Sequence, residues 1–159
     1  MFLLVCPPCG LFFFVMTVTI RFCMGKYHNE ANVVVRRGSA GLGLFAVRDF
    51  RRNDYIIEYK GERVSAEEAD LRGGKYLFAI NDKVVLDGKD RKYTARYMNH
   101  SCVPNAYAEI DEDEEAVYIY AQKKINAGDE ITFDYGKEYF DDIIGGSKNC
   151  LCPKCKKKN

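Results

Sequence analysis

Seven short runs of β-branched and aromatic residues divide this sequence, and they constrain its fold more than any other feature. Residues of these types favour strands, and the Gly, Asn and Asp residues between the runs are typical of turns. The pattern therefore predicts a mainly β domain built from short strands in small sheets. The predicted strands are residues 33–35, 55–59, 76–80, 83–86, 106–110, 116–121 and 130–135.

One helix is predicted between the second and third of these runs. Ser65 and Glu68 have the spacing of a capping box, in which the two side chains satisfy free backbone N–H groups. Gly73 and Gly74 are expected to end the helix. The acidic residues 111–115 lie between two predicted strands, so a solvated hairpin turn is the simplest interpretation. Attraction of a basic substrate is the alternative.

The length and charge of the chain limit what it does. Its 159 residues are enough for one domain with a sizeable core. The formal net charge is only +1, whereas a broad nucleic-acid-binding surface usually carries a clear basic excess. The sequence therefore argues against direct, sequence-specific binding of nucleic acid.

Residues 1–23 differ from the rest of the chain, because they are almost entirely apolar and carry no charge before Arg21. The stretch is long enough for a membrane span, but two prolines and a glycine interrupt it, and no basic segment precedes it. Three interpretations stay open: a membrane anchor, a cleaved signal, or a true translation start at Met24. We favour the start at Met24, and we expect membrane contact only if residues 1–23 are part of the mature protein.

Three segments concentrate the functional side chains. Residues 96–102 hold a guanidinium, an amide, an imidazole, a hydroxyl and a thiol, and residues 133–136 hold a tyrosine just before a turn-forming glycine. Residues 150–155 contain three cysteines. An odd total of seven cysteines with a clustered triplet favours metal ligation over disulfides, and hence a reducing compartment.

Together with Gly41-Leu42-Gly43 and residues 59–62, these segments resemble the SET domain of protein-lysine methyltransferases with a cysteine-rich post-SET tail. The five motifs occur in the order of the family. The resemblance implies a mainly β fold of several short sheets, with few short helices and a knot-like C-terminal segment. It also implies a SET domain at residues 32–136 and a post-SET zinc-binding tail at residues 137–159.

The resemblance implies S-adenosylmethionine as cofactor. Asn99 and His100 would offer hydrogen bonds to it, and Arg96 is expected to face its carboxylate. In another context, Asn99 and His100 would more simply cap a turn or fill a polar slot in the core. The expected cofactor-binding residues are Gly41, Leu42, Gly43, Tyr76, Arg96, Tyr97, Asn99, His100 and Leu151.

Tyr135 is the predicted catalytic residue. In methyl transfer, a neutral lysine amine attacks a sulfonium methyl group in line, so alignment and exclusion of water are decisive. A phenol orients both reactants without charge, and its ordinary pKa of about 10 disfavours a role as general base. Tyr59 is expected as a second channel tyrosine, and Phe133 at the switch position implies di- or trimethylation. Core packing is the alternative for all three aromatic residues.

Structural zinc takes four tetrahedral ligands, and the C-terminal segment supplies only three thiolates. Cys102 is expected to be the fourth, and the resulting site would hold Leu151 near the cofactor and couple metal binding to assembly of the active site. Two residues separate the last two cysteines where the family pattern usually has four, although C-x-x-C pairs also ligate zinc. The predicted ligands are Cys102, Cys150, Cys152 and Cys155.

The sequence thus predicts a protein-lysine methyltransferase that acts on a histone tail or another basic, flexible segment. A catalytically silent SET module that binds a partner as a scaffold is the alternative, and the presence of both channel tyrosines argues against it. A third interpretation, a secreted or membrane-anchored disulfide protein, depends only on residues 1–23. The expected location is the nucleus for a eukaryotic or viral protein, and otherwise the cytoplasm.

Overall fold

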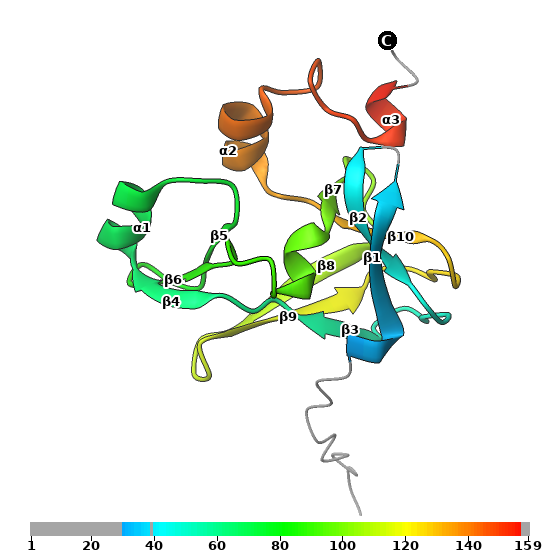
Figure 1. The fold of residues 1–159 in the computed structure, drawn as a ribbon, viewed down its shortest axis with the longest axis horizontal. Helices are drawn as coiled ribbons and strands as arrows, with labels where there is room; N and C mark the ends of the chain where they lie inside the picture. The colour runs from blue at the N-terminus through cyan, green and yellow to red at the C-terminus, as the bar shows by residue number, and fades with distance from the viewer. Residues whose placement is uncertain (1–29, 39, 157–159) are drawn as a thin grey trace, which may run out of the picture.

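The computed structural model describes residues 30–38 and 40–156, so the interpretations of residues 1–23 lie outside the described residues. This part of the chain forms three small sheets with a few short helices, which confirms the predicted fold class (Figure 1). None of the helices in these two ranges has the length and apolar character that a membrane span requires.

The first sheet has four strands in the order β1-β2-β10-β7. The hairpin of β1 (Val33–Gly38) and β2 (Gly41–Ala46) continues into β10 (Glu130–Phe133), which pairs with β2 in antiparallel fashion. On its other side, β10 runs parallel to the two-residue strand β7 (Asn99–His100). This pairing brings the polar segment 96–102 beside the segment that leads to the predicted catalytic tyrosine.

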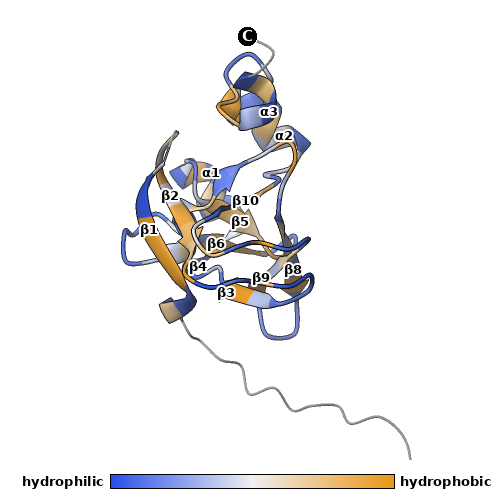
Figure 2. Cartoon of the chain, turned by 90° about the vertical axis from the view of Figure 1, so that its right-hand side faces the viewer, coloured by the Kyte–Doolittle hydropathy of each residue, from blue (hydrophilic) through white to orange (hydrophobic). Residues whose placement is uncertain are grey.

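The second sheet consists of β3 (Tyr55–Glu58), β9 (Ala116–Ala121) and β8 (Ala106–Asp111), with β9 in the centre. Both pairings are antiparallel, and β8 and β9 form a hairpin. The acidic residues lie at the tip of this hairpin, as predicted, and Figure 2 shows the β8–β9 tip as strongly hydrophilic. Glu115 has a φ of 50° at this turn.

The third sheet is formed by β4 (Glu62–Ser65), β6 (Val84–Asp87) and β5 (Leu77–Ala79), and β5 is an edge strand. Both outer strands pair with β6 in antiparallel fashion. Figure 1 shows this sheet on the opposite side of the molecule from the β1–β2 hairpin. Strands β2, β4 and β7 lie outside the set that the sequence predicts.

The predicted helix is α1 (Ala66–Arg72). The Ser65 hydroxyl accepts a 3.2 Å hydrogen bond from the backbone N–H of Glu68, which confirms the N-terminal cap. Gly73, with a φ of 54°, follows the last helical residue, and its N–H donates to the carbonyl of Ala69.

The remaining helical elements are single turns. They are η1 (Glu30–Asn32), the 3-10 turn η2 (Thr94–Tyr97), α2 (Lys137–Tyr139), the π-helical turn η3 (Phe140–Ile144) and α3 (Pro153–Lys156). Figure 1 shows α2 and α3 at one end of the molecule, near the tip of the β1–β2 hairpin.

The main hydrophobic core draws residues from all three sheets. Met98 is only 1% exposed within it, and this burial fixes the residue that joins η2 to β7, inside the functional segment 96–102. The bridge between Phe50 and Ile125 closes the core at the side of the β2–β3 loop. The largest fully buried side chains are Phe50, Leu44, Ile56, Met98, Ile119, Ile125, Ile131 and Val117.

Candidate active site

Two neighbouring cavities lie where β5, η2, β7 and the segment after β10 meet. The smaller cavity has a volume of about 180 Å³, and the larger one has a volume of about 740 Å³. Because the two cavities have lining residues in common, ligands bound in them would meet at a shared neck. The residues that line both cavities are Lys75, Tyr76, Arg96, Tyr135 and Tyr139.

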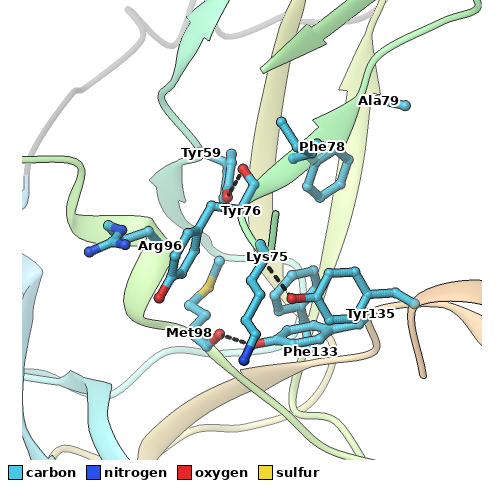
Figure 3. Close-up of a pocket in the computed structure, with 11 residues that line it drawn as sticks. Tyr59, Lys75, Tyr76, Phe78, Ala79, Arg96, Met98, Phe133 and Tyr135 are labelled. Atoms are coloured by element: carbon cyan, nitrogen blue, oxygen red, sulfur yellow. Dashed lines mark hydrogen bonds between the residues drawn. The ribbon is translucent and has the colours of Figure 1, made fainter. Parts of the chain in front are cut away.

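Two tyrosine hydroxyls are fixed to backbone carbonyls in the smaller cavity (Figure 3). The Tyr135 hydroxyl donates a 2.7 Å hydrogen bond to the carbonyl of Met98. The Tyr59 hydroxyl donates a 2.9 Å hydrogen bond to the carbonyl of Tyr76. A hydroxyl that donates to the backbone keeps its oxygen lone pairs available for a further donor.

Packed aromatic rings form the walls of the smaller cavity. The ring centroids of Phe133 and Tyr135 are 4.9 Å apart, and Tyr135 also packs edge-on against Tyr139 at 4.9 Å. Phe78 lies between Tyr59 and Phe133, at 5.3 Å and 6.4 Å. Such walls suit an extended aliphatic chain and leave little room for water.

Burial keeps both hydroxyls neutral. Loss of solvent raises the pKa of Tyr135 and the pKa of Tyr59 well above the ordinary value for a phenol. The Tyr59 hydroxyl fits beside Gly88, where an added Cβ would lie only 2.7 Å from it. The smaller cavity is therefore an uncharged aromatic channel at neutral pH, apart from the cationic groups at its neck.

A polar floor is built into the larger cavity around Asn99. Its side-chain amide donates to Glu130 Oε1 at 2.7 Å and to the carbonyl of Leu42 at 3.1 Å. Gly43 leaves room for this contact, because an added Cβ would approach Glu130 Oε1 to 2.4 Å and displace the carboxylate from Asn99. The amide oxygen of Asn99 accepts no hydrogen bond within the described residues.

Arg96 carries an unused hydrogen-bond donor at the neck. Its guanidinium stacks over the ring of Tyr76, with Cζ 3.9 Å from the ring centroid. Its Nε is buried and has no hydrogen-bond partner within the described part of the chain. A buried donor without a partner is unfavourable, so this group fits a ligand with a negatively charged or polar acceptor.

His100 connects the cavities to the cysteines. Its Nδ1 accepts a 3.3 Å hydrogen bond from the backbone N–H of Tyr135, and its Nε2 lies 3.3 Å from the Cys102 sulfur. Burial lowers the pKa of His100, which favours the neutral imidazole. With Nδ1 as acceptor, the proton is on Nε2 and faces the sulfur.

The four cysteines that the sequence predicts as zinc ligands gather in one cluster, with all their sulfur atoms within 4.8 Å of one another. Cys102 lies 3.9 Å from Cys150 and 3.7 Å from Cys155. Tetrahedral zinc with bonds of about 2.3 Å puts thiolate ligands roughly 3.8 Å apart, whereas disulfide sulfurs lie about 2.05 Å apart. All four are free cysteines that form no disulfide with one another.

Most of the predicted site residues meet at these cavities. Among the residues expected to bind the cofactor, Gly41 and Gly43 do not line the larger cavity, and Gly43 instead allows the close packing of Glu130 against Asn99. Phe45, two residues further along β2, is also absent from the lining, and the guanidinium of Arg36 stacks over its ring. The predicted residues that line it are Leu42, Tyr76, Arg96, Tyr97, Asn99, His100, Tyr135, Leu151, Cys150 and Cys152.

Four contributors to the site are not predicted by the sequence. The four are Met98, Lys75, Tyr139 and Glu130. The Met98 carbonyl accepts the hydrogen bond of Tyr135, the Lys75 carbonyl accepts a 2.7 Å hydrogen bond from Tyr139, and Glu130 accepts the hydrogen bond of Asn99. A backbone carbonyl has no sequence signature. The other three residues are polar or aromatic residues without a motif of their own, so only their position in the fold makes them part of the site.

Comparison with known proteins agrees with this geometry. A family model described as SET domain matches residues 41–136. The H3 lysine-4 specific histone-lysine N-methyltransferase of Neurospora crassa is 35% identical over 146 residues, covering 84% of this chain and 11% of that protein. The histone-lysine N-methyltransferase ATXR7 of Arabidopsis thaliana is 36% identical over 124 residues, covering 69% of this chain and 9% of that protein.

A solved structure is similar as well. A chain in the crystal structure of the polycomb repressive complex 2 of Chaetomium thermophilum superposes with a TM-score of 0.61 and 30% identity. The match covers 66% of this chain and 15% of that chain. The chain described here spans about a tenth of the length of the curated relatives that it matches.

Proposed function

This chain belongs to the SET domain family, and from that membership we propose that it is an S-adenosylmethionine-dependent protein-lysine N-methyltransferase acting on a histone tail. The observation that carries the proposal is the pair of cavities that meet beside the Tyr135 hydroxyl. One cavity is narrow and aromatic, which suits a lysine side chain. The other is large and polar, which suits a nucleoside cofactor.

The chain's own residues would hold the lysine and the cofactor, orient them and exclude water. The aromatic rings around Tyr135 hold the aliphatic part of the lysine and keep water away. The hydroxyl of Tyr135, held by the Met98 carbonyl, orients the attacking amine and the methyl group in line. When bound, the cofactor supplies an electrophilic methyl group. Residues suited to hold it are Leu42, Tyr76, Arg96, Tyr97, Asn99, His100 and Leu151.

We assign Phe133 to the control of product methylation. It is 9% exposed, and its ring packs against Tyr135 and Phe78 at the wall of the channel. A phenylalanine here leaves space that a tyrosine hydroxyl would fill, so the enzyme would accept an amine that already carries a methyl group. The expected products are di- and trimethyllysine.

We assign the cysteine cluster to structural zinc, with Cys102, Cys150, Cys152 and Cys155 as ligands. The cluster's sulfur spacing and the neutral imidazole of His100 beside it support this assignment. Residues 150–153 also line the larger cavity, so zinc would hold the C-terminal tail against the cofactor. A histone substrate would place the protein in the nucleus, at chromatin.

The proposal is tested by incubating the full chain with S-adenosylmethionine and a histone H3 tail peptide. Mass spectrometry should detect mass increments of one to three methyl groups on a lysine, and the same sample should contain about one zinc per chain. Core histones and ribosomal proteins serve as further substrate pools. Absence of any cofactor binding would contradict the enzyme and favour a scaffold function, whereas bound cofactor without transfer would show that the substrate lies outside these pools.

A further inference from the structure

The neck shared by the two cavities is cationic. Lys75 and Arg96 line both cavities, whereas no carboxylate of the described residues lines the smaller one. In Figure 3 the Lys75 side chain extends in the direction of the Tyr135 hydroxyl and the Met98 carbonyl. A target lysine that enters the channel therefore approaches two positive charges before any cofactor is present.

The backbone at Lys75 is held by its neighbours. Its carbonyl accepts the 2.7 Å hydrogen bond from Tyr139, and Tyr76, the next residue, holds the Tyr59 hydroxyl. Among residues 30–38 and 40–156, Lys75 has no ion-pair partner. Its ammonium is therefore not neutralised locally.

No nearby acid cancels this charge. Behind Tyr59, the carboxylate of Asp87 forms an ion pair with Arg72, and the distance from Oδ2 to Nη1 is 3.0 Å. In the larger cavity, the carboxylate of Glu130 accepts a 2.7 Å hydrogen bond from the neutral amide of Asn99, and it forms no ion pair with Lys75. Two further cations, Arg91 and Arg96, line the cavities, and the sulfur atoms of Cys150 and Cys152 belong to the proposed zinc site. The remaining ionisable side chains that line the two cavities are Tyr59, Tyr76, Tyr97, His100, Tyr135 and Tyr139.

We propose that Lys75 promotes methyl transfer by favouring the neutral form of the target amine in the channel, an inference that rests on the proposed function. Like charges in proximity disfavour each other's charged forms. The target ammonium would release its proton to solvent. The amine lone pair then forms the N–C bond as the C–S bond breaks, and the electron pair of that bond goes to sulfur, so no other reactant is needed.

The size of the effect follows from the exposure of Lys75. Two unit charges about 6 Å apart at an effective dielectric constant of 20 would shift a pKa by roughly two units. Lys75 is exposed in the free protein, so solvent and salt screen its charge. We therefore expect a shift of roughly 0.5 to 1 unit, which is about a 3- to 10-fold change in the fraction of neutral amine at neutral pH.

The direct test measures the target amine itself. A histone H3 tail peptide with 13C at Cε of its lysine is bound to the full chain with S-adenosylhomocysteine, and the pKa of the bound amine is read from its NMR shift. Lys75→Met should raise this pKa by roughly 0.5 to 1 unit. Lys75→Arg, which keeps the charge, and Lys124→Met, which removes an exposed lysine outside both cavities, should leave it unchanged.

Turnover gives the second readout, because the pH profile of kcat reports groups in the enzyme–substrate complex. In Lys75→Met the rise of kcat should move to higher pH, with the plateau at high pH unchanged. An unshifted amine pKa in Lys75→Met would overturn the inference, as would a raised KM for S-adenosylmethionine with an unshifted kcat profile. If the wild-type chain transfers no methyl group, the proposed function is contradicted. The NMR titration then still tests the role of Lys75.

Discussion

The hydroxyl of Tyr135 donates a 2.7 Å hydrogen bond to the carbonyl of Met98. The two residues lie in segments that are 37 positions apart in the sequence, and the parallel pairing of β10 with β7 brings these segments together. Met98 is 1% exposed, so its carbonyl is held by the core. The catalytic hydroxyl of the proposed enzyme is thus aimed by the hydrophobic core and not by a flexible loop.

Removal of this hydroxyl should separate chemistry from binding. Tyr135→Phe is expected to lower kcat about 10²-fold, because the amine and the methyl group lose their alignment. Affinity for S-adenosylmethionine should remain, as measured by calorimetry. The lost hydrogen bond should cost only about 1 kcal/mol of stability.

Tyr107→Phe is the matched control, because Tyr107 lies on β8 and stacks on Tyr120 away from both cavities. Its turnover should equal that of the wild type. If Tyr135→Phe unfolds the chain while Tyr107→Phe does not, Tyr135 is a structural residue and its catalytic assignment fails.

Phe133→Tyr should restrict the product. The added hydroxyl would occupy space in a channel of about 180 Å³, so an already methylated amine would no longer fit beside the methyl donor. We expect monomethyllysine to accumulate at a rate of first methylation within a few-fold of the wild type. Mass spectrometry over a time course distinguishes the products, and unchanged trimethylation would contradict the role of Phe133.

Gly88→Ala should disturb Tyr59. The new Cβ would lie 2.7 Å from the Tyr59 hydroxyl, and a tyrosine ring has little freedom to move away. We expect a loss of about 1–3 kcal/mol in the free energy of unfolding, measured with urea in the presence of zinc.

The double variant identifies the cause. Tyr59→Phe removes the clashing hydroxyl, so Gly88→Ala should destabilise the Tyr59→Phe background much less than it destabilises the wild type. Strictly additive free energies would show that Gly88 acts elsewhere, for example through its own hydrogen bond to the Tyr76 carbonyl.

Removal of zinc should weaken binding of the cofactor. A chelator, or the substitution Cys152→Ser, would release the C-terminal tail that lines the larger cavity. We expect at least a 10-fold loss in affinity for S-adenosylmethionine, with recovery in the chelated wild type after zinc is added back. Full affinity in a chain free of zinc would refute the coupling.

Alkaline pH should destabilise the protein through its buried and half-buried tyrosines. Burial raises the pKa of Tyr55 to about 12, and burial also raises the pKa of Tyr59 and of Tyr135. In the unfolded chain these phenols ionise near pH 10, so above this pH the folded state retains protons that the unfolded state releases. Stability should therefore be unaffected by these groups below about pH 10 and fall as the pH rises further.

This dependence is measured by thermal unfolding between pH 8 and 12, with tyrosinate absorbance recorded on the same samples. The absorbance due to Tyr59 and the half-buried Tyr55 and Tyr135 should rise mainly as the chain unfolds. A rise that precedes unfolding would show that these phenols ionise in the folded state and are accessible to solvent.

The sequence by itself determined the local features of this protein. Runs of β-branched and aromatic residues predicted seven of the ten strands. Such side chains favour strands because they pack well on the half-buried face of a sheet. The capping box predicted α1 because Ser65 and the N–H of Glu68 are only three residues apart. The motif segments likewise indicated the family, because each motif is continuous in the chain.

Only the tertiary structure decided how these features combine. Gly41 and Gly43 have low strand propensity, and β2 exists because it pairs with β1 and β10 on its two sides. Met98, Lys75 and Tyr139 join the site because the buried core fixes segments that are distant in the sequence. Local pattern sets which face of a strand is buried, but the partner of each strand depends on contacts across the whole core.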